Sequence, residues 1–202
     1  MSDSKKFWDK QAKRFSNGDN KETIQFINNA KSYLKSDATL MDFGCATGDS
    51  SVLFAKEVNK VVGIDYSDEM IRLANEKHKV ENVSFLATTL DKYNAQMHTF
   101  DIIVALNVLH LINDLDESIK LFSRFIKPNG YLIASTPYVG EKKSFIATAL
   151  TLISKTSVIP HINAFSHNQV LDKFSNYGFK LAFEKCDLGK IPVYFQVFIK
   201  VD

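Results

Sequence analysis

Two acidic side chains lie at the ends of two short apolar segments in the first third of the chain. Asp42 is near the end of the first segment, and Asp65 ends the second, about 20 residues later. Gly44 and Gly48 follow the first acid, and residues without a Cβ let the backbone turn sharply and approach a ligand closely. The amides that begin the next helix would point back into this turn. Two parallel strands that each end in a carboxylate predict a crevice that binds a nucleoside.

The elements that must position these residues alternate between strands and helices. Apolar runs predict strands at 39–43, 60–65, 83–87, 100–106, 131–135, 179–184 and 193–201, and helical spacing predicts helices at 47–58, 67–77, 114–126 and 166–177. This order predicts an α/β fold, a parallel sheet with helices on both faces. The last two strands have no helix between them, which favours an antiparallel pair at the sheet edge.

The chain is expected to form one domain over 1–202, with an N-terminal helical cap at about 4–35 and a lid insertion at about 138–165. Its net charge of +2 gives no argument for a nucleic-acid partner. No apolar run is long enough for an integral membrane segment, and no spacing suggests a metal site. Two cysteines and no apolar leader favour a cytoplasmic protein. Oligomeric state is not indicated.

Five motifs, in order, resemble those of class I S-adenosylmethionine-dependent methyltransferases, of the small-molecule type that acts in ubiquinone and menaquinone biosynthesis. They are Asp42-Phe43-Gly44-Cys45-Ala46-Thr47-Gly48, Gly63-Ile64-Asp65-Tyr66-Ser67-Asp68-Glu69-Met70, Phe100–Val104 with Asn107–His110, Arg124–Leu132 and the opening Phe7-Trp8-Asp9. The resemblance implies a Rossmann-like, seven-stranded mixed sheet whose last strand is antiparallel. It also implies S-adenosyl-L-methionine as cofactor, S-adenosyl-L-homocysteine as product, and methyl transfer to a small molecule by in-line displacement.

Carried onto this sequence, the resemblance gives a set of residues for the cofactor. They are Asp42, Gly44, Cys45, Ala46, Gly48, Asp65, Tyr66, Met70, Thr88, Thr89, Leu90 and Asn107. The two oxygens of Asp65 can accept both ribose hydroxyls. Asp42 either binds the ammonium group of the cofactor or only orders the glycine turn, and Cys45 is expected to be a small packing residue. Tyr66 and Met70 either cover the ribose and adenine or belong to the core.

Four residues depart from the family pattern. Ala46 replaces the middle glycine of the turn, and because alanine disfavours positive φ, the turn is expected to close only with ordinary dihedrals there. Thr88 and Thr89 stand where an acid usually approaches the adenine, and a threonine hydroxyl or a backbone amide can replace that acid. Asn129 replaces a glycine and can also adopt a left-handed turn.

His110 is the candidate catalytic residue, because the ordinary pKa of histidine suits proton transfer near neutral pH. The alternative is that it only packs or orients a loop. Asn107 is not followed by the prolines of DNA and protein amide methylases, which argues against that class. A metal cluster or a catalytic triad is not required, since attack on a sulfonium methyl group depends mainly on orientation.

Apolar residues in the insertion, such as Phe145, Leu150 and Ile153, predict a lid and therefore a partly apolar acceptor. Three other functions remain open. A non-catalytic S-adenosylmethionine-binding protein is suggested by Ala46 and Thr88. A nicotinamide-dependent oxidoreductase fits the second strand but not the spacing of the glycines. A membrane-surface or partner contact through residues 144–155 is the last alternative.

Overall fold

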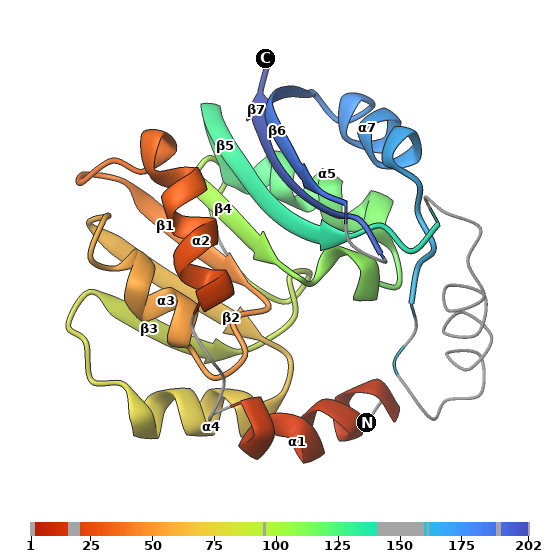
Figure 1. The fold of residues 1–202 in the computed structure, drawn as a ribbon. Helices are drawn as coiled ribbons and strands as arrows, with labels where there is room; N and C mark the ends of the chain where they lie inside the picture. The colour runs from red at the N-terminus through yellow and green to blue at the C-terminus, as the bar shows by residue number, and fades with distance from the viewer. Residues whose placement is uncertain are drawn as a thin grey trace.

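The computed structural model describes residues 3–15, 21–94, 96–140, 160, 162–188 and 191–201, and a seven-stranded sheet runs through them (Figure 1). The strands are β1 (Thr39–Phe43), β2 (Lys60–Asp65), β3 (Val83–Ala87), β4 (Phe100–Leu106), β5 (Ile126–Pro137), β6 (Phe179–Asp187) and β7 (Val193–Lys200). Their order across the sheet is β3-β2-β1-β4-β5-β7-β6. Only β7 is antiparallel to its neighbours, β5 and β6. The mixed sheet and the antiparallel last strand are therefore confirmed.

The helices are α1 (Asp3–Phe15), α2 (Lys21–Ala30), α3 (Asp49–Phe54), α4 (Asp68–Lys77), α5 (Leu115–Phe125) and α7 (His167–Ser175), with short 3₁₀ turns η1 (Lys31–Tyr33) and η2 (Leu109–Leu111). Side-chain caps explain where three of them begin. The Ser67 hydroxyl accepts from the amide of Met70 at the start of α4, and the Asp114 carboxylate caps α5 in the same way. Ser166 forms a capping box with Gln169 at the start of α7.

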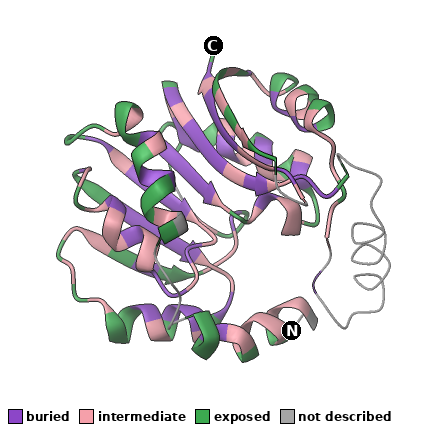
Figure 2. Ribbon diagram, in the orientation of Figure 1, coloured by how far each residue is buried: buried purple, intermediate pink, exposed green. Residues whose placement is uncertain are grey.

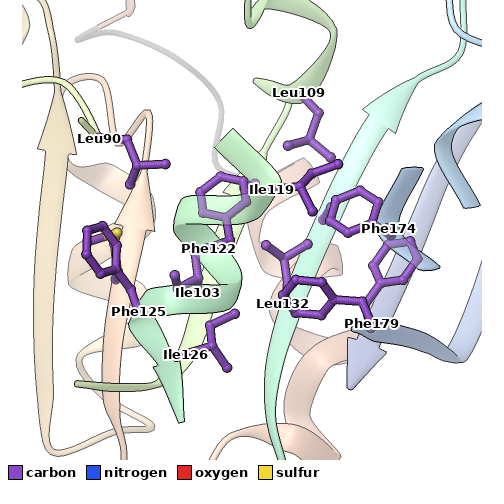
Figure 3. Close-up of a cluster of buried hydrophobic side chains, with 14 of the residues drawn as sticks. Leu90, Ile103, Leu109, Ile119, Phe122, Phe125, Ile126, Leu132, Phe174 and Phe179 are labelled. Carbon is purple, nitrogen blue, oxygen red and sulfur yellow. The ribbon is translucent and has the colours of Figure 1, made fainter. Parts of the chain in front are cut away.

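Successive residues of each central strand point to opposite faces of the sheet, and each face has its own core. Met41 contributes to the core under α5 and α7, whereas Leu40 contributes to the core shared with α2 and α3. Figure 3 shows Phe122 of α5 and Phe174 of α7 gathered beside Leu132 of β5. The strands are mostly buried, while the outer surfaces of the helices are exposed (Figure 2). Helices on both faces leave the carboxyl edge of the sheet for the site.

The bounds of several predicted elements differ in the structure, and β6 extends three residues beyond its predicted end at 184. The helix predicted at 47–58 is the shorter α3, and it begins only at Asp49 because its N-cap, Gly48, has a left-handed φ of +81° that no helix residue adopts. Strand β5 begins five residues before its predicted start, and the pairing with β4 shifts between Phe100 and Ile102. Within that irregularity Asn129 has a φ of +60°, which confirms that it adopts the left-handed turn.

Most of the expected lid insertion, residues 141–159 and 161, lies outside the described residues, so its helix at 144–155 stays a prediction. Its described flanks meet, because the amide of Gly140 donates to the carbonyl of Phe165. At the N-terminus the expected helical cap is divided into α1, α2 and η1. Helix α1 packs against α4 and lies beyond the arrowheads of the first strands (Figure 1). None of the described helices is long and apolar enough to cross a bilayer.

Candidate active site

A cavity of about 1070 Å³ opens at the carboxyl ends of β1, β2 and β4. Strand β1 pairs with β2 on one side and β4 on the other, so the chain winds outward from this point in two directions. Such switch points are where open α/β sheets bind ligands. The volume is at the upper end of the range for small-molecule sites, which leaves room for a cofactor together with an acceptor.

Most of the residues expected from the sequence line this cavity. The lining includes Gly44, Cys45, Ala46, Asp65, Tyr66, Met70, Thr88, Thr89, Leu90, Asn107 and His110. Asp42 and Gly48 are the two expected cofactor residues that do not line it. The cavity therefore gathers side chains from four strand ends that are far apart in the sequence.

The turn after β1 contains left-handed residues and is held by backbone hydrogen bonds. Gly44 and Gly48 have φ angles of +73° and +81°. The amides of Gly44 and Cys45 both donate to the carbonyl of Ile64, at 2.8 and 3.1 Å. A Cβ on Gly44 would lie 2.8 Å from the side chain of Val108, so glycine is required there for space as well as for conformation.

The expectation that Ala46 keeps ordinary dihedrals is wrong, because its φ is +47°. Left-handed geometry costs an L-residue about 1–2 kcal/mol. The amide of Ala46 donates to Asp65 Oδ2 at 3.2 Å, and this contact together with the two left-handed glycines holds the turn in shape. The methyl group in place of a hydrogen therefore does not prevent the turn from closing.

Asp42 lies beneath the turn and is only 1% exposed. Its Oδ2 accepts hydrogen bonds from the hydroxyls of Ser50 and Ser51, at 2.8 and 2.6 Å, and burial raises its pKa. Within the described part of the chain its Oδ1 has no hydrogen-bond partner. These contacts fit the second expected role of Asp42, to order the turn and the first residues of α3.

Gly48 lies off the cavity wall because it packs against the side of α4 and β3. A Cβ at this position would lie 2.5 Å from the ring of Phe85 and 3.2 Å from the Cβ of Ala74. Its amide closes the turn by donating to the carbonyl of Cys45 at 2.9 Å. The glycine is therefore needed for the shape of the turn.

Asp65 faces the cavity from the end of β2 with both oxygens already oriented. Oδ1 accepts from the amide of Ser67 at 2.9 Å, and Oδ2 accepts from the amide of Ala46. Burial raises the pKa of Asp65 to about 6, although these two amides act in the opposite direction. Each oxygen keeps a further lone pair, so the carboxylate can still accept hydrogen bonds from a diol.

The end of β3 contributes an acid that the sequence analysis did not single out. Thr88 is fixed by its amide, which donates to the carbonyl of Asp65 at 2.9 Å, and Thr89 and Leu90 continue the wall. Asp91 also lines the cavity, and the nearby Thr89 side chain holds its pKa below the ordinary value. Asp91 lies two residues after Thr89, where the family usually has an acid, and this spacing could have identified it from the sequence.

Beyond Asn107 the cavity wall is formed by a turn and the 3₁₀ helix η2. Asn107 has a φ of +54°, and its amide donates to the carbonyl of Ser135 at 2.7 Å. This turn leads into η2, where the His110 ring is largely buried against the cavity and its Nδ1 has no hydrogen-bond partner in the described structure. Burial lowers the pKa of His110 to about 4, so the ring is neutral at physiological pH.

The remainder of this part of the wall is mixed, with polar side chains at Asn113, Asp114, Glu117 and Ser118 beside apolar ones. The apolar members are Trp8, Phe15, Val108, Leu111, Ile112, Leu121 and Pro137. They belong to α1, η2 and its flanks, α5 and the end of β5. No group of three His, Cys, Asp or Glu side chains that could hold a metal ion occurs in the described ranges.

Comparisons with known proteins agree with this geometry. A family model described as a methyltransferase domain matches residues 34–191. An uncharacterized methyltransferase of Schizosaccharomyces pombe is 28% identical over 152 residues, 70% of this chain and 53% of that protein. A ubiquinone/menaquinone biosynthesis C-methyltransferase of Campylobacter jejuni is 26% identical over 137 residues, 64% of this chain and 57% of that protein. The chain thus spans little more than half the length of these two relatives.

Among solved structures, an S-adenosylmethionine-dependent methyltransferase from Aquifex aeolicus is 20% identical and has a TM-score of 0.73. The superposition covers 95% of this chain and 98% of that one. At this level of identity the likeness shows a shared fold.

Proposed function

This chain belongs to the class I S-adenosylmethionine-dependent methyltransferase family, and from that premise we propose that it methylates a small, partly apolar molecule. One observation carries the proposal: a single cavity joins the turn at Gly44–Thr47 and Asp65 to the apolar wall around Leu111 and Ile112. A cofactor on the first part and an acceptor on the second would meet beside Asn107. The cavity is large enough for both.

The residues at the first part fit S-adenosylmethionine. The left-handed turn brings backbone close to the cavity, and Asp65 offers a carboxylate of the kind that binds a ribose diol. Tyr66, Met70 and Leu90 would border the adenosine. When bound, the cofactor supplies an electrophilic methyl group on a positively charged sulfur. The protein is left to bind, to orient and to exclude water.

For His110 we propose a role in orienting the acceptor. A pKa of about 4 makes the ring a weak base at neutral pH, but its unpaired Nδ1 remains able to form a hydrogen bond in the cavity. The apolar side chains around it would keep water from the reacting groups. A thiol, an amine or an activated carbon would then need no stronger base.

Calorimetry with S-adenosylmethionine and S-adenosylhomocysteine tests the first step. We expect binding of both, and no binding at millimolar concentration would overturn the proposal. A panel of acceptors, assayed by mass spectrometry for a gain of one methyl group, tests the second step. Quinol-like aromatics come first on this panel, because the Campylobacter relative is named for ubiquinone and menaquinone biosynthesis.

The non-catalytic alternative is not favoured by any contact in the described structure. It was suggested by Ala46 and Thr88, and Ala46 maintains the shape of the turn in spite of its side chain. Tight binding of the cofactor without transfer to any member of the acceptor panel would support it. We further propose a reducing, cytoplasmic location, since Cys45 and Cys186 are both free thiols.

A further inference from the structure

Helix α1 reaches the cavity from outside the sheet. Ser4, Trp8 and Phe15, on one side of this helix, all line the cavity. Trp8 is the only tryptophan of the chain, and its ring makes edge contacts with Phe7 and Phe15 at centroid distances of 5.2 and 5.8 Å. Since α1 packs mainly on α4, whatever fixes it to α4 also fixes this part of the cavity wall.

The central contact between the two helices is made by Asp9. Its Oδ1 accepts from the hydroxyl of Ser67 at 2.6 Å and from the amide of Glu69 at 3.3 Å. Ser67 is fully buried, and its hydroxyl also accepts from Met70 to cap α4. Asp9 therefore places a negative charge from α1 at the N-terminus of α4, where the free amides and the helix dipole favour an anion.

Two further contacts flank this one. The Ser4 hydroxyl lies 2.8 Å from the hydroxyl of Tyr66, and Lys5 forms an ion pair with Asp68. Asp68 is largely exposed, and exposed ion pairs contribute little to stability. The partly buried contact of Asp9 with Ser67 is thus the one expected to decide the position of α1.

The same serine connects α1 to the proposed ribose acid. The amide of Ser67 donates to Asp65 Oδ1 at 2.9 Å, while its hydroxyl donates to Asp9. One residue therefore joins the carboxylate that faces the ligand to the carboxylate that holds α1. A change in the position of either carboxylate is transmitted to the other through a single peptide unit and its side chain.

We propose that Asp9 is a positioning residue that fixes α1 over the cavity, so that Trp8 forms a wall over the bound ligand. Ligand binding at Asp65 and the packing of α1 against α4 then stabilise each other, and this coupling is reciprocal. The proposal rests on the proposed function for the identity of the ligand. The packing of α1 against α4 in the unliganded protein does not depend on which ligand the cavity binds.

The fluorescence of Trp8 and the affinity for S-adenosylhomocysteine test the proposal. In Asp9→Ala we expect Trp8 to become accessible to acrylamide and the dissociation constant to rise about fivefold or more, the lower end of typical coupling. Asp9→Asn keeps an oxygen acceptor without the charge and should fall between Asp9→Ala and the wild type. Glu76→Gln, which removes an exposed partner of Arg72 at the far end of α4, is the matched control and should change neither property.

A double-mutant cycle separates positioning from general stability. If Asp9 acts through Trp8, Asp9→Ala should no longer weaken binding when Trp8→Ala is already present, as measured by calorimetry. Unchanged acrylamide quenching and a dissociation constant within twofold of the wild type in Asp9→Ala would overturn the proposal. If that variant does not fold by circular dichroism, Asp9→Asn carries the same comparison. Failure of the wild type to bind S-adenosylhomocysteine would instead overturn the proposed function. Acrylamide quenching of Trp8 in the unliganded protein would still test whether Asp9 fixes α1.

Discussion

The cavity has two parts that are built in different ways. The part that we assign to adenosine comes from three neighbouring strand ends and the turn after β1, and its shape depends on backbone hydrogen bonds and left-handed residues. The part that we assign to the acceptor comes from α1, η2, α5 and the end of β5, and consists of side chains, both apolar ones such as Leu111 and polar ones such as Glu117. A rigid backbone site suits the cofactor, which is the same in every reaction cycle. A wall made of side chains can be changed by substitution without disturbing the turn.

This difference predicts that substitutions in the first part affect folding and cofactor binding together. Substitutions in the second part should affect the acceptor alone.

Gly48→Val should cause the largest loss. A Cβ would lie 2.5 Å from the Phe85 ring, and the φ of +81° is a region that valine avoids. We expect the free energy of unfolding in urea to fall by about 3 kcal/mol or more, with loss of binding to S-adenosylhomocysteine. Adding Phe85→Ala to Gly48→Ala should remove the steric conflict but not the conformational cost. Wild-type stability in Gly48→Val would contradict this account of the turn.

Asp65→Asn should weaken S-adenosylhomocysteine binding about tenfold to a hundredfold, because hydrogen bonds to a charged acceptor are lost while the fold keeps its shape. Calorimetry measures this change. Glu76→Gln, which neutralises an exposed acid of α4 that does not line the cavity, is a suitable control. An equal loss in both variants would mean that Asp65 has no special part in the site.

The pKa of about 6 for Asp65 gives two opposite pH effects. The folded state holds this proton more tightly than the unfolded state, so the stability of the free protein should fall as pH rises from about 4 to about 6. Ligand hydroxyls favour the ionised form, so affinity for S-adenosylhomocysteine should rise with pH up to about 6 and then level off. Denaturation and calorimetry at several pH values measure both trends. In Asp65→Asn the affinity trend should disappear, and the stability trend should become smaller, because the raised pKa of Asp42 still contributes to it.

In the acceptor part, Leu121→Trp should reduce the space beside Ile112 and raise the KM for an acceptor about tenfold. The dissociation constant of S-adenosylhomocysteine should stay within about twofold of the wild type, since the turn is untouched. Leu121→Met conserves volume and serves as the control. A parallel loss of cofactor binding would show that the two parts are not separable.

His110 should titrate with a pKa near 4 when its ring protons are followed by NMR, because burial disfavours its charged form. Acceptor turnover should therefore not change through protonation of this ring between pH 6 and 8. His110→Gln retains polar atoms in the cavity and should preserve more turnover than His110→Leu. Titration near the ordinary value of 6.5 would remove the basis for a purely orienting role.

The smallest effect is expected from Ala46→Gly, which relieves a left-handed alanine at the cost of a more flexible unfolded chain. We expect a gain of about 0.5 kcal/mol in the free energy of unfolding. For a chain of this size, that corresponds to a rise of about 1–2 °C in melting temperature. Cofactor affinity should stay the same, because the turn already has its final shape.

The sequence by itself determined the strands and their order of appearance. The bounds of β1, β2, β3 and β4 follow from apolar runs that end at acids, glycines or polar turns, which are local signals. The wall residues from Gly44 to Asn107 follow from motifs that stay close to those strand ends. The left-handed φ of Ala46 was not predicted, because neighbouring residues impose it against its own preference.

Only the tertiary structure decided which distant segments complete the cavity. Helical spacing shows that Trp8 and Phe15 share a face of α1, but it cannot show that this face turns toward the cavity, because the contact between Asp9 and Ser67 joins residues 58 apart. In the same way, only the fold shows that Asp42 and Gly48 do not line the cavity. Burial in the folded protein also gives His110 and Asp65 their altered pKa values. Such effects depend on how closely side chains pack, and local sequence carries no record of that distance.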